Sequence, residues 1–169
     1  QGIGAATVRL YRNEDSKLLY ESQTDAEGRY QIFVPSEARQ YMLQIVKQPY
    51  QACEIYGIGV ESDQLVAYQT TVYLFPSGGA AISYRLKLGD ALHYNESRSG
   101  MQTVIASAIN LRAGVNNRTG SIVATAKTDA SGEACVQLSP GIYTVELIAS
   151  GYETVYDTLV ARRNGETER

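Results

Sequence analysis

The chain has 169 residues, of which 44% are hydrophobic and 20% charged, and its formal net charge at pH 7 is −3. This is globular composition, and the length allows one large domain or two modules of roughly 80 residues each. The weakly negative, mixed charge excludes the basic footprint that binds nucleic-acid phosphates. No apolar run reaches about 18 residues, so the sequence predicts no membrane insertion within this segment.

Two copies of one sequence pattern make up most of the chain. Residues 24–28, Thr-Asp-Ala-Glu-Gly, recur at 128–132 as Thr-Asp-Ala-Ser-Gly. Three further landmarks follow in nearly the same frame: Ile3–Leu10 with 104–111, Gln40-Tyr41 with Ile142-Tyr143, and Pro49-Tyr50 with Gly151-Tyr152. The small differences in spacing all fall between these landmarks. The sequence therefore predicts two versions of one module.

Apolar and polar residues alternate along the predicted elements of both copies. In the first copy Tyr30, Ile32 and Val34 alternate with polar or outward positions, and 143–149 alternates in the same way in the second. Such alternation is typical of half-buried antiparallel strands, and Val, Ile, Thr and Tyr suit a pleated surface. Clusters of Asp, Asn, Ser and Gly separate the runs. The sequence predicts an all-β fold of two tandem β-sandwiches and no helix.

The repeated Thr-Asp-Ala-x-Gly is predicted to be a structural turn. Asp25 and Asp129 are placed to accept a hydrogen bond from the amide two residues on, and Gly28 and Gly132 to adopt positive φ. We expect the chain to reverse there as a hairpin corner. The alternative is that both aspartates bind a metal. Calcium loops place several carboxylates within a few residues, and neither aspartate has such a cluster, so no metal site is expected.

The boundary between the modules is placed at the loop-like Pro76–Gly79. This gives a first module at 1–78, a second at 79–162 and a polar tail at 163–169. Residues 81–88 form the predicted first strand of the second module, and 89–102 a long polar connection after it. The equivalent first strand of module one would precede Gln1, so either that module is truncated or another part of the chain completes its sheet. The chain opens on Gln1 rather than Met, which indicates a segment of a longer protein.

The order of these motifs resembles the prealbumin-like sandwich modules known as carboxypeptidase regulatory-like domains and Cna protein B-type repeats. The matching stretches are 6–11 and 24–30 in the first copy, and 128–132, 140–147 and 151–152 in the second. The resemblance implies a prealbumin-like sandwich, a module used as spacer, adhesion unit or enzyme appendage, and a bacterial surface location.

The same resemblance raises the possibility of a Lys–Asn or Lys–Asp isopeptide crosslink. The family's lysine sits at or just after the Val-x-Leu strand. Here Arg9 and Arg12 occupy that region in the first copy, and Asn110 and Arg112 in the second. Arginine keeps its proton and cannot act as the nucleophile, so no isopeptide bond is expected.

No catalytic, cofactor or metal residue is expected either. His93 is the only histidine, and its neighbours are those of a polar loop. Cys53 and Cys135 fall one in each module, a pattern that does not indicate a disulfide framework or a zinc site. We expect both thiols to be unpaired.

The functional expectation is a non-catalytic tandem segment of a secreted or cell-surface bacterial protein, acting as a spacer, stalk or adhesion module. Its partners would be cell-surface or extracellular matrix proteins, or glycans. Two alternatives stay open. The thirteen tyrosines could form a glycan- or peptide-binding surface, since exposed Tyr is common at binding sites. The segment could instead be an accessory domain of a larger secreted hydrolase.

Overall fold

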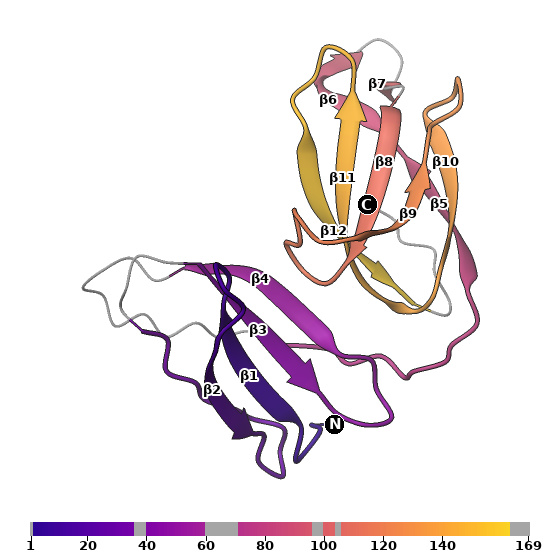
Figure 1. Ribbon diagram of the computed structural model, residues 1–169. Coiled ribbons are helices and arrows are strands. Elements are labelled where there is room, and N and C mark those ends of the chain that lie inside the picture. The colour runs from indigo at the N-terminus through magenta and orange to yellow at the C-terminus, as the bar shows by residue number, and fades with distance from the viewer. Residues whose placement is uncertain (1, 36–39, 60–70, 96–99, 104–105, 163–169) are drawn as a thin grey trace. The chain divides into compact units, whose positions relative to one another are not determined.

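The protein is all-β. The computed structural model describes residues 2–35, 40–59, 71–95, 100–103 and 106–162, without the side chains of 90–107. These residues contain twelve strands and no helix, and every pairing between strands is antiparallel (Figure 1). The arrangement is consistent with β-sandwiches. Within the described ranges, no helix is long and apolar enough to cross a membrane.

The chain divides into two compact units. The first comprises Gln1–Gly78 with Gly114–Asn117, and the second comprises Gly79–Ala113 with Arg118–Arg169. The four-residue segment belongs to the first unit because Val115 exchanges backbone hydrogen bonds with Glu54 and Tyr56. The boundary predicted at Pro76–Gly79 did not anticipate this contribution from beyond Gly78.

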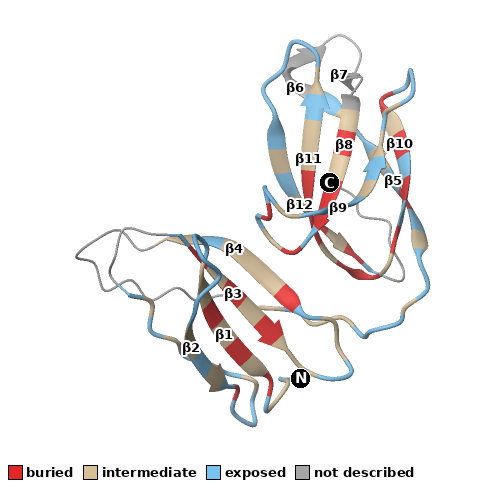
Figure 2. Ribbon diagram, in the orientation of Figure 1, coloured by how far each residue is buried: buried red, intermediate tan, exposed pale blue. Residues whose placement is uncertain are grey.

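The first unit contains a four-stranded sheet in the order β2-β1-β3-β4. Its strands are β1 (Thr7–Arg12), β2 (Leu18–Gln23), β3 (Gln40–Val46) and β4 (Cys53–Gly59). Val8, Leu10, Leu43 and Ile45 alternate with half-buried residues along β1 and β3 and are at most 4% exposed (Figure 2). Alternate residues point to opposite faces of a strand, so one face of the sheet supplies the core.

Two segments without strand pairing cover this core. Tyr30 and Ile32 pack on it from the segment after the first turn, and Val72 and Leu74 from residues 71–75. Neither segment forms a ladder within the described residues, so the strand predicted at 29–34 is wrong. The sequence placed the first strand of this layer before Gln1. Part of the layer is instead supplied by residues 71–75, which follow β4.

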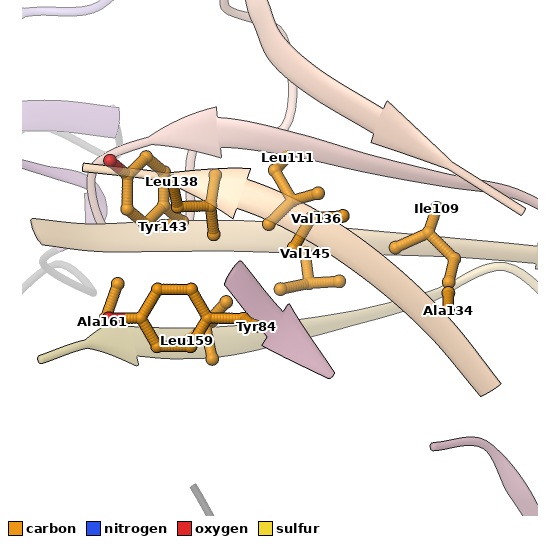
Figure 3. Packing of buried hydrophobic residues seen from close by; sticks show 10 residues of the cluster. All are labelled: Tyr84, Ile109, Leu111, Ala134, Val136, Leu138, Tyr143, Val145, Leu159 and Ala161. Atoms are coloured by element: carbon orange, nitrogen blue, oxygen red, sulfur yellow. The ribbon is translucent and has the colours of Figure 1, made fainter. Parts of the chain in front are cut away.

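The second unit repeats the same sheet. Its four strands lie in the order β9-β8-β11-β12, which matches β2-β1-β3-β4 position for position. They are β8 (Ala106–Ala113), β9 (Ile122–Ala126), β11 (Gly141–Ala149) and β12 (Val155–Ala161). A second sheet pairs β5 (Ile82–Lys87) with β10 (Glu133–Leu138). Figure 3 shows the ten buried side chains, drawn from both sheets, that form the core of this unit.

The connection predicted at 89–102 is a hairpin instead. β6 (Gly89–Asn95) pairs with β7 (Gly100–Thr103) through an irregular register. The sequence did not predict these strands, because this stretch is polar and lacks the apolar alternation that marks a half-buried strand.

Candidate functional site

The repeated turn has the same hydrogen-bond pattern in both units. In the first, Asp25 Oδ1 accepts from the amides of Glu27 (3.0 Å) and Arg29 (2.8 Å). Gly28 has φ of 80°. The carboxylate thus bonds to the backbone of its own turn, and Gly28 takes a conformation that residues with a Cβ rarely adopt.

In the second unit, Asp129 Oδ1 accepts from the Ser131 amide (2.8 Å), the Ser131 hydroxyl (2.6 Å) and the Glu133 amide (3.0 Å). These bonds, the Ser131 hydroxyl first, lower the pKa of Asp129. Gly132 has φ of 76°. No group of three or more His, Cys, Asp or Glu that could hold a metal occurs among the described residues.

In the second unit the turn joins two sheets and is not a hairpin corner. The strand before it, β9, lies in the four-stranded sheet, whereas β10 after it pairs with β5. The expectation of a hairpin is therefore wrong. The local turn chemistry is compatible with either connection, because it fixes only the chain reversal and leaves open which strands pair.

Alanine at Gly28 and at Gly151 should have unequal effects. Positive φ costs an L-residue about 1–2 kcal/mol. Gly151→Ala should lower the free energy of unfolding by only that amount, because Gly151 has φ of 84° and nothing lies within 4 Å of an added Cβ. Gly28→Ala should cost more, because an added Cβ would lie 2.6 Å from the Ile3 amide nitrogen and 2.8 Å from Gly2 Cα. Urea denaturation of the two variants measures this. Equal losses would contradict the close approach at Gly28.

A row of polar side chains crosses the outer face of the first unit's sheet. Arg9 Nε lies 2.7 Å from Glu21 Oε2 on β2. On the neighbouring strands, the Gln44 amide donates to Glu54 Oε1 (3.0 Å), and the Tyr56 hydroxyl donates to Glu54 Oε2 (2.7 Å). Burial, and then this bond to Glu54, raises the pKa of Tyr56 to about 12.

The second unit has a row at the repeat-equivalent positions. Asn110 (2.8 Å) and Arg112 (3.1 Å) donate to Glu146 Oε2, and the Tyr156 hydroxyl donates to Oε1 (2.7 Å). Thr125 continues the row by donating to Asn110. The bonds from Asn110 and then Tyr156 contribute most to lowering the pKa of Glu146.

This second row is more deeply buried than the first. The side chains of Arg112 and Glu146 are 10% and 12% exposed, against 36% and 50% for Arg9 and Glu21. Arg112 Nε also donates to the Gly120 carbonyl, and Arg118 lies 4.6 Å from the centre of the Tyr156 ring. The row thus forms a closed network in which Glu146 has three donors, and it stabilises the sheet face.

Three of the four residues considered for an isopeptide bond belong to these rows. Arg9, Asn110 and Arg112 lie on the outer sheet faces with the partners described, and Arg12 pairs with Asp15 at 2.6 Å. Each of these residues taken singly does not predict a row. The signal was present, since each lies at an outward position of an alternating strand in equivalent parts of both copies.

The two cysteines are free and differ in environment. Cys53 is buried, and burial together with the smaller effect of Glu54 raises its pKa to about 11. Cys135 is exposed on β10, opposite Arg85. His93 lies in β6, and its side chain falls outside the described residues.

Thiol labelling should therefore separate the cysteines. At pH 8, with an aromatic disulfide reagent, one thiol per chain should react quickly and map to Cys135, because the thiolate is the reactive form and Cys53 is both protonated and covered. Cys135→Ser should abolish the fast phase, and Cys53→Ser should leave it unchanged. Fast labelling of Cys53 in the native protein would contradict its burial.

Comparisons with known proteins show only weak likeness. No protein family and no curated protein matches the chain. Among solved structures, the Bacillus anthracis TIE protein matches with a TM-score of 0.35 and 15% identity over 96% of this chain. The match covers 29% of that protein's chain, so the present chain spans less than a third of it. A likeness of this strength carries no argument about topology or function.

Proposed function

We propose that the chain is a non-catalytic segment of two prealbumin-like sandwich modules, acting as a spacer or stalk in a secreted or cell-surface bacterial protein. One observation carries the proposal: the same four-stranded sheet, in the same strand order, occurs in both units. Duplication of a self-contained unit extends a chain in defined steps, which is the mechanical requirement of a stalk.

The polar rows support this role. Glu21, Glu54 and Glu146, the acidic side chains of the rows, are bound by neighbouring Arg, Gln, Asn or Tyr side chains. A catalytic acid or base must reach a substrate proton directly or through one water, whereas these groups are directed at their own sheet.

A glycan-array screen of chain 1–169 tests the spacer role, with no saturable binding expected. A second candidate, adhesion to a glycan, would be favoured by the opposite result. It rests on the outer face of the first sheet, where Tyr11 and Tyr56 are half-buried beside the Arg9 and Gln44 row. Aromatic rings next to hydrogen-bonding groups suit sugar contact.

Two tyrosine variants distinguish the spacer role from adhesion to a glycan. Saturable binding that is lost in Tyr11→Ala and Tyr56→Ala, but kept in the control Tyr152→Ala, would overturn the spacer proposal. Tyr152 is 47% exposed and lies in the second unit, so it matches the two test tyrosines in residue type but not in location.

A further inference from the structure

The edge of β4 in the first unit carries a short added strand. β4 is the last strand of its sheet, and Val115 pairs with it in parallel, opposite Ile55. The Val115 amide donates to the Glu54 carbonyl (2.8 Å), and the Tyr56 amide donates to the Val115 carbonyl (2.9 Å). A strand residue directs its N–H and C=O to one side, and its neighbours direct theirs to the other. Glu54 and Tyr56 therefore offer their backbone groups at the open edge.

The segment that fills this edge, Gly114–Asn117, fits it closely. An added Cβ at Gly114, where φ is 98°, would lie 2.8 Å from a backbone carbonyl oxygen of β4. The Asn116 side chain donates to the Tyr56 carbonyl at 3.3 Å, and a Cβ at Gly57 would clash with that side chain. Backbone bonds and close approach together make this edge a site for a glycine-aliphatic-asparagine segment.

β12 is the equivalent edge strand of the second unit, and the residues that face its open side follow from the register. Asp157 lies opposite Val145 of β11. Ile55 lies opposite Leu43 of β3, which is the equivalent of Val145 in the repeat frame. Asp157 therefore takes the place of Ile55, and the next residue, Thr158, directs its amide to the open edge.

The Thr158 amide is already occupied. It donates to Oδ1 of its neighbour Asp157 at 2.7 Å. On β4 the equivalent amide, that of Tyr56, donates to the added strand instead. The Asp157 carboxylate thus takes up the donor that an added strand needs, and it places a negative charge where that strand's carbonyl oxygen would lie. Charged side chains at a sheet edge prevent pairing with further strands.

We propose that Asp157 closes the edge of β12 to added strands, so that a segment of the Gly114–Asn117 type pairs with β4 and not with β12. The excluded partner is an extended segment of another chain, a second copy of this one included. An open edge on β12 would let one copy pair with the next in open-ended chains. Closure of this edge is independent of the spacer role, which the glycan screen tests.

The test compares the full parent chain with Asp157→Ala, which frees the amide that follows and adds little apolar surface. The probe is a peptide with the sequence 113–117, blocked termini and Asn116→Gly. Glycine adopts the positive φ of 53° found at this position without strain. It also lacks the side chain that would meet Leu159, which stands on β12 where β4 has Gly57.

In two-dimensional NMR, the peptide should shift the Thr158 amide signal of Asp157→Ala saturably. It should bind this variant about tenfold more tightly than the parent, because one backbone hydrogen bond is gained. Asp157→Asn keeps an oxygen that can accept from the same amide, so it should bind the peptide more weakly than Asp157→Ala. Glu153→Ala removes an exposed charge just before β12 and is the matched control, which should behave as the parent does.

Absence of a saturable shift in Asp157→Ala up to millimolar peptide would overturn the proposal. So would binding to the parent or to Glu153→Ala that equals binding to Asp157→Ala. A shift at Tyr56 in place of Thr158 would show that the peptide displaces the chain's own segment from β4, and it would equally overturn the assignment to β12. A peptide that also carries Val115→Pro should bind none of these proteins, because proline lacks the amide that the pairing requires.

Discussion

Leu111→Ala is expected to lower the free energy of unfolding of the second unit by about 3 kcal/mol, the middle of the range for a buried leucine truncated to alanine. Leu111 is 0% exposed and lies on β8, opposite Val145 of β11. Its removal leaves a cavity in the core between the two sheets, which the rigid strand ladders prevent from closing. Differential scanning calorimetry and urea denaturation measure the loss.

Leu10→Ala is the matched variant, because Leu10 is the repeat-equivalent residue on β1 and is also 0% exposed. It should destabilise the first unit instead. The accessibility of Cys53 to a thiol reagent reports opening of that unit, so Leu10→Ala should speed its labelling and Leu111→Ala should not. Leu18→Ala, at a position 45% exposed, is the surface control. Equal acceleration by both core variants would contradict the division into two units.

The sequence alone predicts the strands along which buried and exposed residues alternate. Tyr143, Val145 and Leu147 were expected on one face of a strand, and they lie on the core side of β11. The all-β class followed from the same signal, because period-two burial depends only on the pleat of the strand itself. The turn residues were equally legible, since Asp25 and Asp129 bond within their own turns.

The sequence did not predict which segments pair with one another in the sheets. Arg29–Val34 alternates as well as β10 does, yet it forms no ladder among the described residues, because a ladder requires a partner that the segment does not encode. The hairpin of β6 and β7 and the contribution of Val115 to the first unit are similar cases of contacts between distant or unpatterned residues. The polar rows depend on strand register, which single positions do not reveal.

Glu146→Ala is expected to lower the free energy of unfolding of the second unit by about 3 kcal/mol, because loss of one partner of a buried ion pair leaves the other charge uncompensated. Arg112 keeps its bond to the Gly120 carbonyl but loses the carboxylate at 3.1 Å. Glu146→Gln should cost less, since it keeps an oxygen that accepts from Asn110 or Tyr156. Urea denaturation should show the free energy of unfolding falling from the parent protein to Glu146→Gln and then to Glu146→Ala.

The pH dependence follows from the same carboxylate. The folded-state pKa of Glu146 is lowered from 4.5, so its contribution is complete at neutral pH and is lost as pH falls through the folded value below 4.5. The loss of stability between pH 7 and pH 3 should therefore be smaller in Glu146→Gln than in the parent protein. Glu21→Ala removes an exposed pair at an outer position of the equivalent row and should leave the thermal midpoint unchanged, because solvent screens such pairs. Equal losses of stability in Glu146→Ala and Glu21→Ala would contradict the larger contribution expected of the buried row.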